Sequence, residues 1–264
     1  MDRKVVVITG GGSGLGKGMA EKYVNEGWNV VISGRTVEKL ENAKKEIETF
    51  DNQVLTYGMD VREPELVKNM VDATIEKFGR IDLLINNAAG NFIVDSEDLS
   101  PNGWKSVVEI VLNGTWFCSQ AVAKQWIKDG TKGSILNIVA PWPGGVPGVV
   151  HSTSAKAGVL AMSKTLAVEW GKKYGIRVNC IAPGGIDDTE GVKRLMPTEE
   201  SYKQAVKNVP LGRFAKLEEV AGIAYFLSSP QAEYINGECI NIDAGEHLAQ
   251  VDFLSHLSKG ASVN

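Results

Sequence analysis

Thr9-Gly10-Gly11-Gly12-Ser13-Gly14-Leu15-Gly16 lies between a short β-branched run, Val5 to Thr9, and an amphipathic stretch that begins at Gly14. Glycines allow a tight turn and a close approach of the backbone, and the amino end of a helix offers unpaired N–H groups to an anion. A glycine cluster alone is weak evidence, but a position between a strand and a helix is the context that a pyrophosphate-binding turn requires. We therefore predict a dinucleotide site here, with candidate binding residues Thr9, Gly10, Ser13, Gly14, Leu15 and Gly16.

The same alternation of strand and helix continues along the chain. β-Branched runs predict seven strands, at Val5 to Thr9, Asn29 to Ser33, Gln53 to Gly58, Ile81 to Asn86, Ser134 to Val139, Arg177 to Ala182 and Glu238 to Ile242. Amphipathic stretches predict helices at Gly14 to Glu26, Thr36 to Glu48, Pro64 to Phe78, Pro101 to Lys128, Ser152 to Lys173 and Leu217 to Leu227. Repeated βα units of this kind predict an α/β fold, a Rossmann-type doubly wound sheet of mainly parallel strands with helices on both faces.

Composition limits the number of domains and the class of partner. The 264 residues are 43% hydrophobic, enough to bury one sizeable core, and residues 1–264 are predicted to form a single dinucleotide-binding domain. The formal charge of −4 comes from interleaved acidic and basic residues. Because there is no basic stripe, nucleic acid is a poor candidate partner.

The cysteines and histidines argue against a metal site or a disulfide framework. Cys118, Cys180 and Cys239 are odd in number and far apart, and the three histidines lack the spacing of metal ligands. Buried thiols of this kind suit a reducing compartment. The first predicted strand begins at Val5, which leaves no room for a targeting segment, and no apolar run approaches membrane-spanning length, so we expect a cytoplasmic protein.

Two segments interrupt the alternation. Ala140 to Gly148 is rich in proline and glycine and leaves the carboxyl end of the fifth strand, where open α/β sheets place their ligands. Residues 184–210 form a longer insertion that is too polar for core and is predicted to be a substrate lid, although a surface excursion explains its composition equally well. The tail after Gly245 has little periodicity and is expected to be surface packing or a subunit contact.

Residues after the second, third and fourth strands indicate how a dinucleotide would be held. An acidic residue after the second strand would accept hydrogen bonds from an unmodified ribose, but this chain has Arg35, which favours NADPH. Asp60 and Val61 would suit the adenine. Asn87, Ala88 and Ala89 would bring small residues against the ribose, although such stretches also occur in ordinary turns.

The start of the helix at Ser152 indicates the reaction class. Many nicotinamide-dependent reductases carry tyrosine four residues before a lysine, one helical turn away, so that the cation stabilises the phenolate and the tyrosine protonates a carbonyl oxygen. Here Ser152 precedes Lys156 at that spacing. A serine hydroxyl has no accessible anionic form, so ordinary ketone or alcohol oxidoreduction is disfavoured.

Taken in order and spacing, Thr9 to Gly16, Asn86 to Gly90, Asn113, Lys156 and Pro183-Gly184 resemble the short-chain dehydrogenase/reductase family along nearly the whole chain. More narrowly, the segments 86–92, 111–115, 154–159 and 166–171 look like the 2,4-dienoyl-CoA reductase branch, which lacks the usual tyrosine. The resemblance implies NADPH-dependent reduction of 2,4-dienoyl-CoA to a 3-enoyl-CoA in the oxidation of unsaturated fatty acids, with an acyl-CoA as the substrate.

The resemblance also assigns roles to individual residues. Asn113 would donate to the substrate or to an ordered water, and Lys156 would hold the nicotinamide ribose and supply positive potential for the charge that develops on the thioester oxygen. Asn91 and Phe92 would contact the substrate, in a pocket shaped also by Trp142 and the lid. The remaining cofactor residues implied by the family are Pro183, Gly184 and Ile186.

Several positions depart from the branch. Pro141 occupies the place where mitochondrial-type members carry an alternative catalytic tyrosine, Val139 replaces the usual family serine, and Gly185 replaces a common proline. These departures leave the proton donor open among His151, Ser152, Ser154 and water. An alternative interpretation is therefore an impaired NADPH-binding homologue or an altered variant that keeps the fold and cofactor but has lost the chemistry.

The resemblance also implies partners. Members usually form homotetramers through the two long helices, here residues 101–128 and 152–173, and through the C-terminal strands. Apolar positions that would permit this assembly, and would equally permit packing on the sheet, are Val107, Val108, Val111, Val159, Met162 and Leu166. Candidate contacts to the CoA phosphates, which are otherwise ordinary solvated charges, are Lys193, Arg194 and Lys207.

Overall fold

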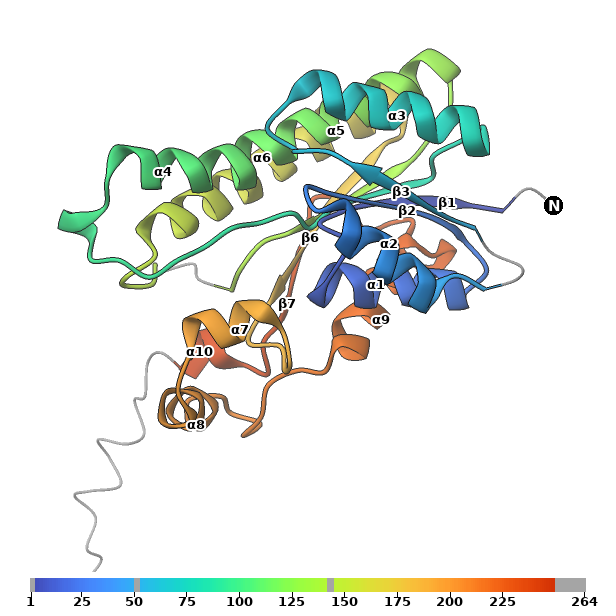
Figure 1. Cartoon of the computed structure of the whole chain (residues 1–264). Coiled ribbons are helices and arrows are strands. Elements are labelled where there is room, and N and C mark those ends of the chain that lie inside the picture. Colours follow the sequence, from blue (N-terminus) through green and yellow to red (C-terminus); the bar gives the residue numbers. More distant parts are fainter. Residues whose placement is uncertain (1–2, 50–52, 142–144, 250–264) are drawn as a thin grey trace, which may run out of the picture.

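Seven strands form one parallel sheet in the computed structural model, which describes residues 3–49, 53–141 and 145–249 (Figure 1). The sheet order is β3-β2-β1-β4-β5-β6-β7. The strands are β1 Val5–Thr9, β2 Asn29–Gly34, β3 Val54–Gly58, β4 Leu83–Asn86, β5 Ser134–Ile138, β6 Arg177–Pro183 and β7 Cys239–Ile242. The predicted Rossmann-type fold is confirmed. Because the chain winds outward in both directions from β1 and β4, the crevice for a ligand opens at the carboxyl ends of these two strands.

Helices cover both faces of the sheet (Figure 1). One face carries α1 Gly14–Asn25, α2 Val37–Ile47 and α9 Leu217–Ser228, and the other carries α3 Pro64–Phe78, α5 Gly114–Asp129 and α6 Val150–Tyr174. Strand β1 contributes side chains to both cores, because successive side chains of a strand point to opposite faces of the sheet. Val6 and Ile8 pack beneath α1, whereas Val5 and Val7 pack beneath α3 and α5, and all four are fully buried.

Two buried polar side chains fasten helices across these layers. Tyr23 of α1 donates its hydroxyl to the carbonyl oxygen of Ala224 in α9 at 2.9 Å. On the other face, Trp126 of α5 donates its indole N–H to the carbonyl oxygen of Ile81 at 2.7 Å, just before β4 begins. Each aromatic body fills the core while its polar atom finds a partner, as buried tyrosine and tryptophan require.

The long helix predicted for Pro101 to Lys128 is interrupted. Helix α4 covers Pro101–Val108, a π-helical turn η2 covers Glu109–Asn113, and α5 continues from Gly114. Apolar spacing cannot reveal such a turn, because one extra residue in a single turn barely disturbs the pattern. Single π-turns inside α-helices occur often at functional sites. The interruption therefore draws attention to Asn113, its last residue.

The insertion at residues 184–210 contains α7 Glu190–Leu195 and α8 Glu199–Lys207, which lie with α10 Glu246–Ala249 in a lobe apart from the main layers (Figure 1). The prediction that this insertion is too polar for core was wrong in part. Val192 and Val209 are buried against Phe214, and these three residues form a small core of their own. Short 3-10 helices occur at η1 Ser96–Asp98 and η3 Pro230–Ala232.

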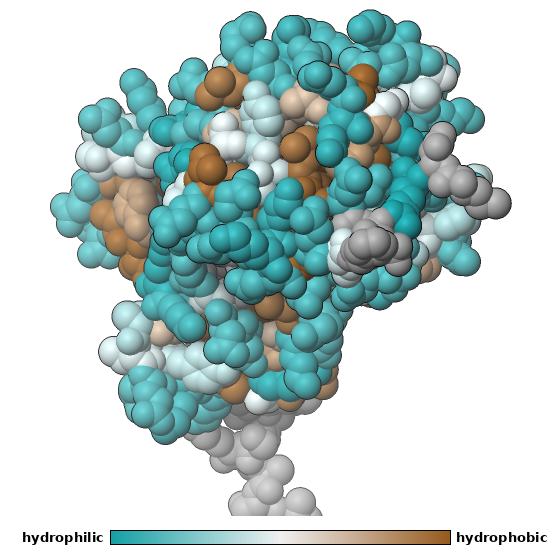
Figure 2. Space-filling view, turned by 45° about the vertical axis from the view of Figure 1, so that its right-hand side comes forward, coloured by the Kyte–Doolittle hydropathy of each residue, from teal (hydrophilic) through white to brown (hydrophobic). Residues whose placement is uncertain are grey.

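Hydrophilic residues dominate the surface seen in Figure 2, with apolar residues gathered in small patches. Within the described ranges, no helix has the length and apolar character needed to cross a membrane. The tail predicted to make surface or subunit contacts lies mostly outside the described residues, except for α10. Trp142, predicted to shape the substrate pocket, also lies outside them.

Candidate cofactor and active site

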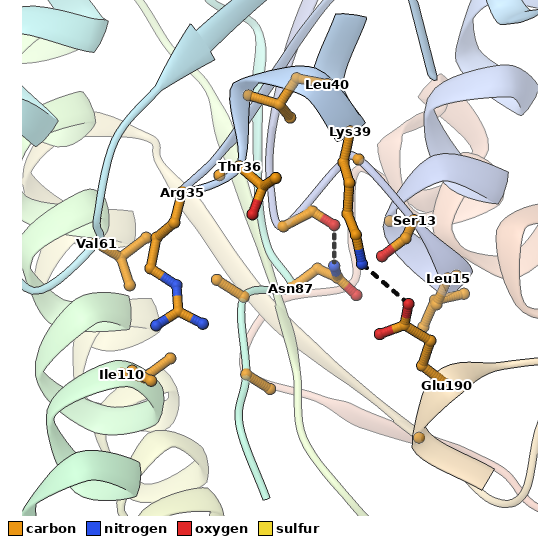
Figure 3. A pocket seen from close by; sticks show the side chains of 18 of the residues that line it. Ser13, Leu15, Arg35, Thr36, Lys39, Leu40, Val61, Asn87, Ile110 and Glu190 are labelled. Atoms are coloured by element: carbon orange, nitrogen blue, oxygen red, sulfur yellow. Dashed lines mark hydrogen bonds and ion pairs between the residues drawn. The ribbon is translucent and has the colours of Figure 1, made fainter. Parts of the chain in front are cut away.

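A cavity of about 430 Å³ opens at the carboxyl ends of β1 to β4 (Figure 3). Its volume falls within the range of small-molecule sites. Residues from the glycine turn, from the ends of β2, β3 and β4, from the π-turn and from α7 line it: Gly10, Gly12, Ser13, Gly14, Leu15, Gly16, Gly34, Arg35, Thr36, Lys39, Leu40, Met59, Asp60, Val61, Asn87, Ala88, Ala89, Ile110, Ile186, Thr189, Glu190, Gly191 and Arg194.

The glycine turn is shaped to accept a phosphate group. Gly14 has a φ of 51°, a conformation that favours glycine. A Cβ on Gly16 would lie 2.2 Å from the carbonyl oxygen of Gly10, so only glycine fits there. Ser13, the N-cap of α1, makes no side-chain cap bond, and the first residues of α1 line the cavity. The N–H groups and positive end of α1 therefore suit a pyrophosphate.

Thr9 fastens the glycine turn to the segment after β4. Its hydroxyl oxygen accepts hydrogen bonds from the backbone N–H groups of Asn87 and Ala88, both at 3.0 Å, and the side-chain amide of Asn87 donates back to the carbonyl oxygen of Thr9 at 3.0 Å. Thr9 is buried beneath the cavity and does not line it. Of the predicted cofactor residues, Thr9 is thus a support for the cavity wall.

Arg35 lies on the side of the cavity that also holds Val61 and Ile110 (Figure 3). Asp60, nearby, is held by Arg62, whose Nη2 lies 2.6 Å from Asp60 Oδ2 and whose Nε donates to both carboxylate oxygens at 3.0 Å. These hydrogen bonds keep the pKa of Asp60 below its ordinary value. Because Arg62 neutralises the Asp60 carboxylate, Asp60 repels an anionic ligand bound at Arg35 only weakly.

Helix α7 contributes two charged residues, Glu190 and Arg194, to the lining of the cavity. Lys39 of α2 extends toward Glu190, the first residue of α7, with Nζ 3.1 Å from Oε1 (Figure 3). Arg194 approaches the other oxygen of Glu190 at 3.2 Å. Lys39 holds the pKa of Glu190 below its usual range, and Arg194 contributes less. Arg194, predicted as a CoA contact, therefore lies at the dinucleotide cavity.

Asn113 closes the π-turn and is partly buried. Its side-chain amide donates to Oε2 of Glu109 at 2.8 Å, and both residues belong to the same turn. The bond fixes the orientation of the amide, so that its remaining N–H and carbonyl oxygen are directed by the helix rather than free to rotate. Neighbouring Ile110 lines the dinucleotide cavity, which places the π-turn at its border.

Lys156 points back toward β5, where its ammonium group donates to the carbonyl oxygen of Ile138. Burial lowers the pKa of Lys156 to about 8, and the nearby thiol of Cys180 offsets this slightly. One turn earlier in α6, Ser152 is 4% exposed. At the position where related folds carry a tyrosine, this chain thus has a buried serine. Lys156 follows one turn later, and because its pKa is lowered it gives up its proton more readily than an ordinary lysine.

His151 is fully buried, and among the described residues neither of its ring nitrogens has a hydrogen-bond partner. Its ring packs on Phe92 with ring centroids 4.4 Å apart. Burial lowers the pKa of His151, so the ring is neutral near pH 7. Because an orphaned buried nitrogen costs free energy unless something satisfies it, His151 is a candidate to contact a bound molecule.

Other predicted residues do not line the dinucleotide cavity: Asn91, Phe92, Lys156, Pro183 and Gly184. The backbone N–H of Phe92 is bound by the side chain of Asn91 at 2.9 Å, and the segment that follows runs beside Gly148, whose carbonyl oxygen accepts from Val94 N–H at 3.0 Å. Asn91 and Phe92 therefore lie near His151 and outside the dinucleotide cavity. Pro141 is buried.

A buried polar network that the sequence analysis missed joins β4, β5, α5 and α6. Asn86 donates to the side-chain oxygen of Asn137 at 2.8 Å and to the hydroxyl of Ser119 at 2.9 Å. Asn137 in turn donates to the hydroxyl of Ser163 at 2.8 Å. The signal was present, because Asn137 stands inside the apolar run of β5. Such a network is stable only when most of its polar atoms have hydrogen-bond partners.

Comparison with known proteins agrees with this geometry. The family model for enoyl-(acyl carrier protein) reductase matches residues 10–247. The chain is 53% identical to a probable 2,4-dienoyl-CoA reductase [(2E)-enoyl-CoA-producing] of Bacillus subtilis, over 96% of this chain and 100% of that protein. It is 41% identical to the peroxisomal 2,4-dienoyl-CoA reductase [(3E)-enoyl-CoA-producing] of Danio rerio, over 96% of this chain and 85% of that protein.

A solved structure is similar throughout. The crystal structure of a short chain dehydrogenase from Bacillus anthracis matches with a TM-score of 0.85 and 58% sequence identity, and the match covers 92% of this chain and 96% of that chain.

Proposed function

The chain belongs to the short-chain dehydrogenase/reductase family, in its 2,4-dienoyl-CoA reductase branch, and from this we propose that it reduces 2,4-dienoyl-CoA thioesters with NADPH in fatty-acid β-oxidation. One observation carries the proposal. Lys156 is retained while the tyrosine four residues before it is replaced by buried Ser152, a combination suited to reduction of a carbon–carbon bond rather than of a carbonyl.

The cavity fits a phosphorylated dinucleotide. Its glycine turn and the amino end of α1 provide N–H donors for a pyrophosphate, and glycine at position 16 lets α1 begin in close contact with the Gly10 carbonyl oxygen. Arg35 supplies a cation where an acidic residue would select the unphosphorylated cofactor. We therefore propose NADPH as the preferred cofactor, with Arg35 on the 2'-phosphate.

The catalytic task of the chain is to stabilise negative charge on the substrate. When bound, the nicotinamide supplies a hydride, which would add to the terminal carbon of the conjugated diene and send charge to the thioester oxygen. Asn113, oriented by Glu109, would donate to that oxygen or to a water beside it. Lys156 would leave Ile138 for the cofactor ribose and provide positive potential at the same place.

A proton must then reach carbon, and its position determines the product. Protonation at C2 gives a 3-enoyl-CoA, and protonation at C4 gives a 2-enoyl-CoA. We propose that a water delivers this proton, held by the buried side chains of His151 and Ser152. Because His151 is neutral near pH 7, it suits the role of orienting a water better than that of an acid.

The direct test is to mix the purified protein with NADPH and a short 2,4-dienoyl-CoA and to follow the oxidation of NADPH by its absorbance. The affinity for NADPH is measured separately by calorimetry. Turnover at rates ordinary for reductases supports the proposal, and proton NMR of the product places its double bond. Tight NADPH binding without substrate-dependent oxidation contradicts the substrate assignment.

That last outcome would favour the second candidate function, an impaired NADPH-binding homologue. Buried Pro141 favours it, because mitochondrial-type members of the branch carry a catalytic tyrosine at that place. Pro141→Tyr distinguishes the two functions: it should raise activity greatly in an impaired enzyme and little where water is the donor. Loss of a single donor typically costs about 10²- to 10³-fold in rate, so slow turnover alone does not establish a binding role.

We also propose a cytoplasmic homotetramer. The apolar positions considered for assembly do not support it directly, because Val107, Val111, Val159 and Leu166 are almost completely buried within the single chain. Support comes instead from apolar side chains left exposed on α4 and α6, Trp104 at 39% and Val168 at 71%. Sedimentation velocity tests the assembly.

A further inference from the structure

An ion pair spans the mouth of the dinucleotide cavity. Lys39 lies in the first turn of α2, and Glu190 is the first residue of α7, more than a hundred residues later in the chain. Their charged atoms are 3.1 Å apart, and their side chains are 54% and 55% exposed. Both residues line the cavity (Figure 3). The pair therefore ties the lid lobe to the cofactor-binding half of the fold.

Lys39 sits beside the glycine turn. A Cβ added to Gly12 would lie 3.5 Å from the carbonyl carbon of Lys39, so the start of α2 packs directly on the turn that receives phosphate. Figure 3 shows the Lys39 side chain running past Ser13 toward Glu190, on the opposite side from Arg35. The cavity thus presents cations from two sides.

Glu190 is the unusual member of the pair. A carboxylate that lines a site for a polyanionic ligand repels that ligand unless cations neutralise it. Glu190 has two such cations, because Arg194 approaches its second oxygen at 3.2 Å from one turn further along α7. Glu190 can therefore lose its ion pair with Lys39 and remain paired with Arg194.

We propose that Lys39 is a phosphate-binding residue of the dinucleotide site, and that Glu190 holds it until a phosphate of the cofactor replaces the carboxylate. This inference rests on the proposed function, since it requires a dinucleotide in the cavity. An exposed ion pair contributes little to stability, whereas a phosphate offers more charge and several acceptor oxygens to the same ammonium group. The exchange is therefore favourable, and it releases α7 from α2 when the cofactor enters.

The test is calorimetric titration of the cofactor-free protein with NADPH and with NADH, without substrate. Lys39→Gln should weaken NADPH binding about tenfold. Glu190→Gln should strengthen it two- to fivefold, because the competing carboxylate is gone. In the double variant, Glu190→Gln should give no gain over Lys39→Gln alone, since the competition needs Lys39.

Two matched variants control for general changes in charge. Lys44→Gln removes a cation from the same helix, and Glu199→Gln removes a carboxylate from the same lobe; both residues form ion pairs, with Glu48 and Lys203, away from the cavity. Each control should leave both affinities within about twofold.

The two nucleotides identify which phosphate Lys39 binds. A loss confined to NADPH assigns Lys39 to the 2'-phosphate, and an equal loss with NADH assigns it to the pyrophosphate; either supports the inference. Unchanged affinity in Lys39→Gln, or weaker binding in Glu190→Gln, overturns it. If the wild-type protein binds neither nucleotide, the cofactor assignment fails and the inference fails with it, whereas binding without dienoyl-CoA turnover removes only the substrate assignment.

Discussion

The ammonium group of Lys156 donates a hydrogen bond to the carbonyl oxygen of Ile138, the last residue of β5. A carbonyl oxygen stabilises a cation less than a carboxylate would, so this bond only partly compensates for burial. The consequence is a pKa of about 8 for Lys156. The lysine thus loses its charge within a pH range that enzyme assays can reach.

Activity should fall as pH rises through about 8 if the positive charge of Lys156 is needed. We expect kcat/KM for NADPH, which reports the cofactor-free enzyme, to decline tenfold per pH unit above that value. Lys156→Arg should remove this decline because arginine stays charged, although its own level of activity will be lower. A flat profile for the wild-type enzyme up to pH 9.5 would show that the charge is not required.

The same pKa predicts a change in stability. Between pH 8 and 10.5, the ordinary lysine value, the unfolded chain binds a proton that the folded chain has released, so the free energy of unfolding should rise with pH across that window. Urea denaturation of the wild type and Lys156→Met at pH 8 and 10 measures this difference. Equal changes in both proteins would contradict it.

Protonation of His151 should destabilise the fold at acid pH. Its folded-state pKa lies below the ordinary value of 6.5, so the unfolded chain binds the proton first and stability falls as pH decreases below about 6.5. The free energy of unfolding should fall by at most about 1.4 kcal/mol for each pH unit. His151→Leu, which keeps the site apolar, should show a smaller loss between pH 7 and 5 in urea denaturation. It should also react more slowly with dienoyl-CoA while binding NADPH normally.

Gly16→Ala should damage both the fold and the cofactor site. The new Cβ would lie 2.2 Å from the Gly10 carbonyl oxygen, and relief of such overpacking costs about 1–3 kcal/mol. We expect a lower melting temperature by differential scanning fluorimetry and at least tenfold weaker NADPH binding. Gly222→Ala is the matched control. Apart from the backbone of its own helix, no described atom lies within 4 Å of its Cβ position in α9, so it should stabilise the protein by about 0.5–1 kcal/mol and leave binding unchanged.

Arg35→Ala should remove the preference for NADPH. Hydrogen bonds to a charged group contribute about 1.5–3 kcal/mol, which corresponds to about 10- to 100-fold in NADPH affinity. NADH affinity should change less than twofold. Calorimetry with both cofactors measures this difference, and a parallel loss of both would show that Arg35 supports the cavity wall instead of selecting the 2'-phosphate.

Much of the fold was predictable because its signals are local. Glycines, β-branched runs and apolar spacing indicated all seven strands and the helices that cover the sheet, and Pro64–Phe78 matched at both ends. The strand Val5–Thr9 also matched at both ends, and the ends of the other elements shifted by a few residues. Glu109–Asn113 could not be recognised as a π-turn, because one extra residue in a single turn barely disturbs the apolar spacing.

The candidate site was predictable only where a motif stands beside a strand. The glycine turn, Arg35, Asp60 and Asn87 follow strands directly, and the parallel sheet brings them to one edge. Lys39 and Glu190 carry no such signal, since their meeting depends on how the 184–210 insertion folds over the edge. The same dependence places Arg194 at the dinucleotide cavity, although the sequence suggested a CoA contact.

The hydrogen bond between Asn86 and Asn137 has a consequence for folding. The two residues lie opposite each other in β4 and β5. If β5 slid by one residue, Asn137 would turn to the other face of the sheet, and both amides would be buried without each other. The leucines and isoleucines of these two strands would tolerate such a slip. The amide pair therefore favours the native register of β4 and β5 over a register shifted by one residue.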